Sequence, residues 1–310
     1  MVRQAHHDIS LRGMSPYNCI IILGPTASGK TKLAAELAYK LEAEIINADS
    51  RQVYKELNIG SGKDLSEYLI NGKQIPYHLI DITNLNTHFH LYNYVTHFIE
   101  VFNKLISEKK IPLICGGTGL YLDTILKKHQ YVSVPVNEIQ RAELQKLDME
   151  DLLKYFHQSK TDYHEHADIS TKKRLIRAIE IAAYLSENNL TATNFPELNP
   201  LIIGIDISRE ERRKKIGERL KTRLKEGLID EVKTLLNSGI PAERLMFLGL
   251  EYNYVTQYIT AKISYDQMYL QLETAIHQFA KRQMTWFRKM EREGFKINWV
   301  KNIDDALRLL

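Results

Sequence analysis

The segment GPTASGKT, residues 24–31, carries the most specific chemical signal in this sequence. It matches the pattern G-x-x-x-x-G-K-[S/T] of phosphate-binding loops, which lie between a strand and a helix. Gly24 and Gly29 let backbone N–H groups point toward an anion, and the following helix adds the positive end of its dipole. Lys30 supplies a point charge, and the Thr31 hydroxyl can ligate Mg²⁺. The segment therefore predicts a phosphate-binding loop without identifying the phosphate.

Two further candidate segments follow predicted strands. Asp49, in IINADSRQVY, comes after a strand expected beside the phosphate-loop strand, at the edge where open α/β sheets bind ligands. The same spacing also suits a structural role, in which Asp49 or Ser50 caps a turn that begins near Arg51. In CGGTGLYLDTIL, a glycine-rich turn places the Thr118 hydroxyl in the same crevice, although such a turn alone is weak support for a function.

The identity of the phosphate depends on whether an acidic Mg²⁺ ligand accompanies the loop. ATP-using enzymes of this kind normally place one at the end of another strand. The strand in IPLICGG ends without one, whereas YHLID ends in Asp81, which leaves a kinase open. Because no arginine-rich lid follows Asp81, a kinase is the weaker hypothesis.

Lysine and arginine gather in three predicted helices, within residues 209–225, 171–180 and 280–289. Such a run is often only a solvated helix face with charge pairs four residues apart. Three basic helices on a chain of formal net charge +4 nevertheless favour a large anionic substrate, such as an RNA or DNA backbone. Trp286, in the third helix, is expected to lie in the core rather than to stack on a base.

Composition excludes several other classes. Cys19 and Cys115 each lie in an apolar run, which predicts buried reduced thiols and excludes a disulfide framework. His164 and His166 give only a weak zinc signal, because no third ligand accompanies them on a regular element. No apolar run approaches the roughly 18 residues of a spanning helix, so we expect a soluble, cytoplasmic protein without a membrane partner.

The predicted elements position these candidates at one edge of a sheet. Apolar runs over residues 17–23, 43–48, 77–82 and 111–117 predict buried strands, and segments with helical spacing separate the later ones. Alternation of this kind predicts a doubly wound α/β fold around a mostly parallel sheet.

The remaining segments divide the chain into parts. Residues 1–16 predict a flexible leader, and residues 131–199 predict a strand-free helical insertion domain. The α/β core then consists of residues 17–130 and 200–310. Its second part is expected to hold strands over 201–207 and 296–300 and long helices over 209–239 and 268–294.

These segments together resemble the bacterial tRNA dimethylallyltransferases, also called tRNA isopentenyltransferases. The resemblance runs in order through GPTASGKT, INADSRQVYKELNIG, PYHLIDI, GGTGLY, RLIRAIE, GLIDEVKTLL and AKRQMTWFR, over about residues 20–300. It implies transfer of a dimethylallyl group from dimethylallyl diphosphate to N6 of the adenosine 3′ to the tRNA anticodon.

The resemblance implies a role for each catalytic candidate. The phosphate loop would hold the diphosphate leaving group, with Mg²⁺ at Thr31, and Arg219 would clamp the diphosphate as its negative charge grows. Asp49 would be the general base for the adenine amine, and Thr118 would orient the nucleotide or the diphosphate. The diphosphate-binding residues would be Gly24, Pro25, Thr26, Ala27, Ser28, Gly29, Lys30 and Thr31.

The anticodon stem-loop is the implied partner of a second set of residues. The target base would flip into a channel. The channel would be lined by Asp49, Ser50, Arg51, Gln52 and Thr118, and the RNA would be contacted by Arg141, Lys173, Arg174, Leu175, Ile176 and Arg177. A monomer is expected.

Several positions depart from the family pattern. NIGSGKD stands where DIGTAKP is common, so that Asn58, Ser61, Gly62 and Asp64 differ. Tyr77, Lys173 and Leu250 stand where histidine, glutamine and tyrosine are usual. These departures affect the expected reading of the anticodon loop rather than the chemistry.

Other functions stay open at this point. An adenylate isopentenyltransferase would prenylate free AMP, ADP or ATP, but a free nucleotide needs no basic helical insertion. A small-molecule or nucleoside kinase is a second possibility, and a non-enzymatic RNA-binding protein is a third.

Overall fold

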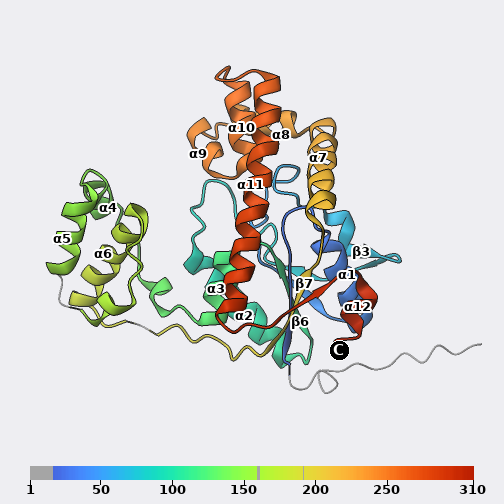
Figure 1. Ribbon diagram of the computed structural model, residues 1–310, viewed down its shortest axis with the longest axis horizontal. Coiled ribbons are helices and arrows are strands. Elements are labelled where there is room, and N and C mark those ends of the chain that lie inside the picture. The colour runs from blue at the N-terminus through green and yellow to red at the C-terminus, as the bar shows by residue number, and fades with distance from the viewer. Residues whose placement is uncertain (1–16, 159–160, 191) are drawn as a thin grey trace, which may run out of the picture. The chain divides into compact units, whose positions relative to one another are not determined.

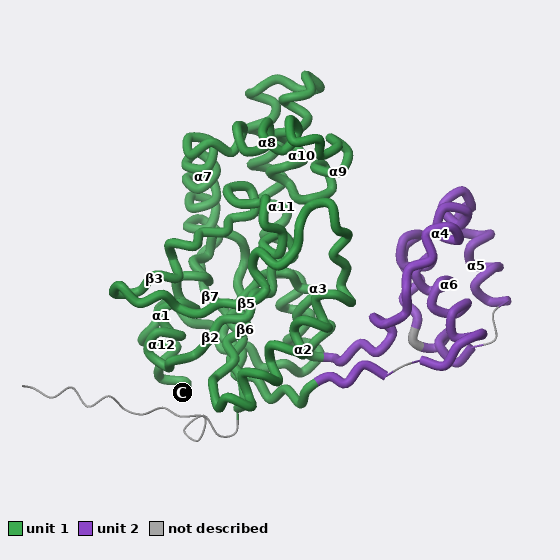
Figure 2. Tube along the Cα trace, turned by 180° about the vertical axis from the view of Figure 1, so that it is seen from behind, with its two compact units in different colours: residues 1–126, 196–310 green, residues 127–195 purple. Residues whose placement is uncertain are grey.

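The computed structural model describes residues 17–158, 161–190 and 192–310. They form two compact units (Figure 2), of which residues 127–195 make the smaller and the rest of the described chain the larger. Each boundary falls a few residues before the predicted one, and the predicted leader lies outside the described residues. No helix in the described part of the chain is long and apolar enough to cross a membrane.

A six-stranded parallel sheet, in the order β5-β2-β6-β1-β7-β8, forms the centre of the larger unit (Figure 1). Because β1 lies between β6 and β7, the ends of these three strands meet at one edge, where doubly wound sheets bind ligands. The predicted α/β fold class is confirmed. The strands are β1 (Cys19–Leu23), β2 (Glu44–Asn47), β5 (Tyr77–His78), β6 (Pro112–Gly116), β7 (Pro200–Ile205) and β8 (Ile297–Val300).

One predicted strand is much shorter than expected. The chain leaves β5 after His78, because Leu79 and Asp81 have φ angles of 62° and 58°, which a strand does not accommodate. Before it, the 3₁₀ helix η1 (Leu65–Tyr68) leads into a small hairpin that the sequence patterns did not predict, β3 (Leu69–Ile70) and β4 (Lys73–Gln74).

Helices pack on the sheet and bury its strands. Ile20 and Ile22 of β1 pack in one core with Leu37 of α1 and Ala306 of α12, while α2 contacts β2 and β6. The helices of the larger unit are α1 (Lys30–Leu41), α2 (Leu91–Ser107), α3 (Gly119–Lys127), α7 (Arg209–Lys225), α8 (Leu228–Asn237), α9 (Ala242–Phe247), α10 (Leu250–Ile259), α11 (Tyr265–Arg292) and α12 (Ile303–Leu307).

A second core joins α7, α8, α10 and α11, which gather beyond one end of the sheet (Figure 1). Val53 and Leu57 belong to this core, so it also anchors the segment after Asp49. The prediction of one helix over 209–239 is wrong. Gly227, with φ 104°, ends the first helix and caps the second, so α7 and α8 are separate.

The smaller unit contains helices and no strand among its described residues. Its core packs Leu152 and Phe156 against Leu175 and Ile179. Within it the buried carboxylate of Glu180 accepts hydrogen bonds from Arg141 and Arg177. The elements are η2 (Gln130–Ser133), α4 (Glu138–Leu144), α5 (Met149–Gln158), η3 (Asp162–His166) and α6 (Lys172–Glu187).

Replacing Glu180 by Gln should destabilise the smaller unit by about 3–5 kcal/mol, because two guanidinium groups lose their buried counter-charge. Hydrogen exchange of the amides in α4–α6 measures this within the whole chain. The control is Glu143→Gln, which removes an exposed pair with Lys146 and should cost less than about 1 kcal/mol. Equal losses in the two variants would contradict the assignment.

Candidate active site

The loop between β1 and α1 has the geometry of an anion cradle. Ala27 and Gly29 adopt positive φ angles of 60° and 85°, which turn the chain into the first turn of α1. The Ser28 hydroxyl is buried and has no hydrogen-bond partner among the described residues. A buried hydroxyl without a partner costs free energy, so the loop fits a ligand that accepts a hydrogen bond from Ser28.

Two cations accompany this loop. Burial lowers the pKa of Lys30, the first residue of α1. Burial and, secondly, the charge of Arg223 lower the pKa of Arg219 to about 10. Arg219 Nη2 also donates a hydrogen bond of 2.8 Å to Thr26 Oγ1 within the loop. Because desolvation disfavours both charges, a bound anion would stabilise them.

Asp49 caps a turn, the structural role expected for it, and uses only one of its carboxylate oxygens to do so. Asp49 Oδ1 accepts the Arg51 N–H at 2.9 Å, so the carboxylate caps a turn, although no helix begins there. Asp49 is half-buried, and Oδ2 takes no hydrogen bond from another described residue. Capping therefore leaves the second oxygen for chemistry.

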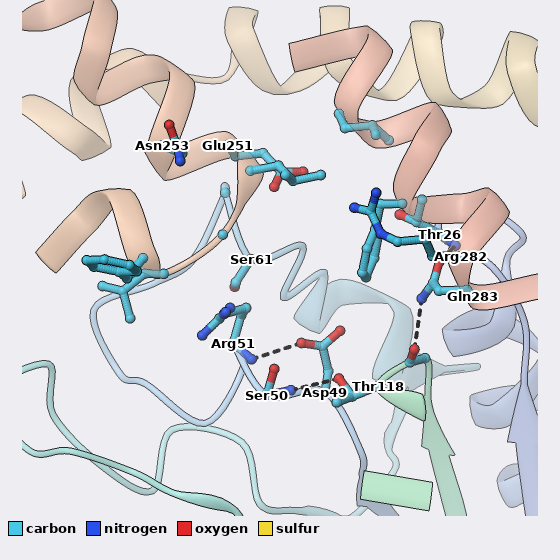
Figure 3. A pocket seen from close by; sticks show the side chains of 18 of the residues that line it. Thr26, Asp49, Ser50, Arg51, Ser61, Thr118, Glu251, Asn253, Arg282 and Gln283 are labelled. Atoms are coloured by element: carbon cyan, nitrogen blue, oxygen red, sulfur yellow. Dashed lines mark hydrogen bonds between the residues drawn. The ribbon is translucent and has the colours of Figure 1, made fainter. Parts of the chain in front are cut away.

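Thr118 joins the Asp49 turn to the end of β6. Its Oγ1 accepts the Ser50 N–H at 3.2 Å (Figure 3). Its own N–H donates to the Ala48 carbonyl at 3.3 Å. The acidic turn and the glycine-rich turn predicted from the sequence are thus directly bonded to each other.

Two cavities meet at these residues. The larger, of about 490 Å³, is lined by Asp49, Arg51 and Thr118 together with Phe247 and Trp286. The smaller, of about 270 Å³, lies at the phosphate loop and is lined by residues including Lys30, Thr31 and Glu67. Both are lined by Thr26, Asp49, Ser61, Arg219, Phe279 and Gln283.

The cavities differ in chemistry. The larger has an aromatic wall of Phe247, Phe279 and Trp286, of which Phe247 is 82% exposed. The prediction of Trp286 in the core is wrong in part, since its ring is half-buried, lines the cavity and carries Lys289 Nζ 5.2 Å from its centroid. Such a cavity fits a planar or apolar group, whereas the smaller fits a phosphate.

The donor set at Thr31 suits Mg²⁺. Asp64 and Glu67 line the smaller cavity with Thr31, and burial together with Asp64 raises the pKa of Glu67. In the described chain, no three His, Cys, Asp or Glu side chains lie together in a group that could hold a metal ion such as zinc. Mg²⁺ binds oxygen and often needs only one or two protein ligands beside a substrate phosphate, so Thr31 fits it as part of a phosphate complex.

Asp81 does not serve this site. It pairs with the buried ammonium of Lys63, which also donates to the Tyr54 carbonyl at 2.9 Å. Asp81 lines neither cavity. This removes the residue on which the kinase hypothesis depended.

Two of the departures near residue 60, Gly62 and Asp64, lie beside the buried Arg223. A Cβ on residue 62 would lie 2.0 Å from Arg223 Nη2, and φ there is +67°. Glycine therefore leaves room for the guanidinium in its present position and adopts this φ without strain. Asp64 lies 4.0 Å from Arg223, and Glu251 lies 3.4 Å from it, so the arginine has counter-charges.

Sequence reasoning missed Glu231 and Gln283. Glu231 accepts the N–H groups of Asn58, Ile59 and Gly60, and so holds the segment that lines both cavities. Gln283 is buried and hydrogen-bonds to Thr26 of the phosphate loop and to Gly117 of the glycine-rich turn (Figure 3). The available signal was a polar residue in the buried stripe of α11, which runs through Ile276, Ala280 and Phe287.

Within the smaller unit, the predicted RNA contacts separate into two groups. Lys173 and Arg174 are exposed, whereas the side chains of Leu175 and Ile176 are buried in the core of the unit. The prediction for Leu175 and Ile176 is therefore corrected, since their packing leaves no surface for RNA. Arg141 and Arg177 are half-buried on Glu180.

Comparisons with known proteins agree with this geometry. Residues 52–290 match the family described as IPP transferase. The chain is 50% identical to "tRNA dimethylallyltransferase 2" of Phocaeicola vulgatus, over 93% of each chain. Among solved structures, it is similar to the tRNA isopentenylpyrophosphate transferase of Bacillus halodurans (TM-score 0.67, 26% identity, 94% and 93% covered). It is also similar to that of Staphylococcus epidermidis (TM-score 0.62, 28% identity, 94% and 95% covered).

Replacing Lys30 by Ala should weaken binding of inorganic diphosphate about 10- to 100-fold, because one charged hydrogen bond to the anion is lost. Isothermal titration calorimetry with Mg²⁺ present measures the affinity. The control is Lys32→Ala, which removes an exposed lysine two residues further along α1. An unchanged affinity for Lys30→Ala would show that the loop does not hold the anion.

Proposed function

The chain belongs to the IPP transferase family, and on this premise we propose that it transfers the dimethylallyl group of dimethylallyl diphosphate to N6 of the adenosine 3′ to a tRNA anticodon. One observation of the structure supports this reaction independently of the family. Two chemically different cavities share Asp49, so a diphosphate and a base can approach one carboxylate from two sides.

The diphosphate leaves from the smaller cavity. As the allylic C–O bond breaks, its electron pair stays on the diphosphate oxygen, where Lys30 and Arg219 supply positive charge and Ser28 a hydroxyl donor. These groups bind the growing charge more strongly than the ground state. Mg²⁺ at Thr31 would neutralise part of that charge when bound.

The adenine amine enters from the larger cavity. Its lone pair forms the new N–C bond, and the N6 proton passes to Asp49 Oδ2, whose partner oxygen keeps the carboxylate in place through Arg51 N–H. The Thr118 oxygen accepts the Ser50 N–H, and its O–H has no acceptor among the described residues, so it can donate to a substrate. Phe247, Phe279 and Trp286 limit the access of water to the electrophilic carbon.

RNA binding is assigned to cations that reach the surface or the larger cavity. Lys173 and Arg174 in the smaller unit are exposed, and at the larger cavity Arg282 is exposed and Arg51 half-buried, so these four can contact phosphates of an anticodon stem-loop. Since residues of one chain line both cavities, a monomer suffices, and the cytoplasm is where such an enzyme would meet tRNA.

The proposal is tested with purified protein, dimethylallyl diphosphate, Mg²⁺ and unmodified tRNA, followed by mass spectrometry of the adenosine. Asp49→Asn should lower turnover about 10²- to 10⁴-fold, because the general base is lost. Asn keeps the oxygen that caps Arg51, so folding is preserved, and diphosphate affinity should hold or increase because a negative charge is removed.

The control for this variant is Asp230→Asn, which changes an exposed carboxylate on α8. Wild-type turnover in Asp49→Asn would exclude Asp49 as the base. Prenylation of free AMP in place of tRNA would assign the chain to the adenylate isopentenyltransferases instead.

The double variant Lys173→Ala/Arg174→Ala should weaken tRNA binding without changing diphosphate affinity. Each lost phosphate contact should flatten the slope of log affinity against log salt by about one. Binding titrations at several salt concentrations measure this, with Lys154→Ala of the same unit as the control. An unchanged salt slope would remove these two residues from the RNA interface.

A further inference from the structure

Within the described chain, Gln283 is the one side chain that hydrogen-bonds both to the phosphate loop and to the glycine-rich turn after β6. Its Oε1 accepts the Thr26 N–H at 2.8 Å, and its Nε2 donates to the Gly117 carbonyl at 2.9 Å. Both bonds are buried, and Gln283 is 6% exposed. Because an N–H only donates and a carbonyl only accepts, the two partners fix the orientation of the amide.

The two bonds belong to a continuous chain of contacts. On one side, the Thr26 hydroxyl oxygen accepts a hydrogen bond from Arg219 Nη2. On the other, Gly117 precedes Thr118, whose Oγ1 holds the Ser50 N–H beside Asp49. Gln283 therefore connects the phosphate loop and its cation to the turn that carries the carboxylate (Figure 3).

The Gly117 backbone and the Gln283 amide approach each other closely. A Cβ on residue 117 would lie 2.4 Å from Gln283 Nε2, so only glycine lets the amide reach the carbonyl. The surrounding stripe of α11 is apolar and buried, which leaves the amide no competing partner of similar quality. Breaking either bond would leave a buried polar group unsatisfied.

We propose that Gln283 is a positioning residue that sets the separation between the leaving-group site and the general base. The inference rests on the proposed function, in which the nitrogen must lie in line with the breaking C–O bond. A displacement of about 1 Å in such a reaction can cost about 10²-fold in rate. Gln283 touches neither reacting atom in this account and acts through Thr26 and Gly117.

Kinetic measurements on Gln283→Glu and Gln283→Met test the proposal. Glu keeps an acceptor for Thr26 but loses the donor to Gly117, and Met loses both. We expect kcat to fall about 100-fold. In the uncharged variant Gln283→Met, the affinities for inorganic diphosphate and for tRNA, measured separately by titration, should change less than about threefold. Gln278→Glu and Gln278→Met, at an exposed position of the same helix, are the matched controls.

A second measurement does not depend on catalysis. Inorganic diphosphate added to the wild-type protein should slow amide hydrogen exchange in residues 24–31 and also in residues 117–121. In Gln283→Met, which adds no charge, the first effect should persist and the second should be lost. This separates failure of the proposal from failure of the proposed function, which would show as absence of prenyl transfer in the wild-type protein.

Two results would overturn the proposal. One is a parallel fall of kcat and of both affinities in Gln283→Met, which indicates a general structural role. The other is an exchange response in residues 117–121 that persists in Gln283→Met, which shows that the turns communicate without this side chain.

Discussion

The desolvation of Lys30 and Arg219 is the constraint on which the rest of the site depends. Burying cations beside backbone N–H groups and an unpartnered Ser28 hydroxyl costs free energy, which an anion can return. The Thr26 hydroxyl holds the Arg219 guanidinium at the loop, and Lys30 is fixed as the first residue of α1. A preorganised set of donors of this kind is suited to a charge that grows during a reaction.

The parallel sheet converts this local feature into a two-substrate site. β1, β2 and β6 end at the same edge, so three segments distant in sequence present the phosphate loop, Asp49 and Thr118 to one another. The second core beyond that edge places α11 over all three. Glu231 and Arg223 then fix the segment around Gly60, which lines both cavities from the remaining side.

Sequence patterns were sufficient for the parts governed by local rules. The strand, turn and helix of residues 19–41, most of the buried strands and the helices of the smaller unit follow from periodicity, glycine placement or apolar runs, although the strand expected over 77–82 ends at His78. The hydrogen bonds of Gln283, the pairing of Arg223 with Asp64 and the cavity position of Trp286 depend on packing between distant segments. A helix pattern shows which residues face inward but not which partners they meet there. The burial of Leu175 and Ile176 illustrates the same limit, because a basic run also contains the apolar positions of its own helix.

In the proposed reaction the phosphate loop binds the group that leaves rather than the group that is transferred. The most direct measurement is the yield of diphosphate and of modified adenosine in one reaction that contains tRNA, dimethylallyl diphosphate and Mg²⁺ but no nucleoside triphosphate. We expect the two products to accumulate in equal amounts. A requirement for ATP, or diphosphate release with no modified adenosine, would contradict it.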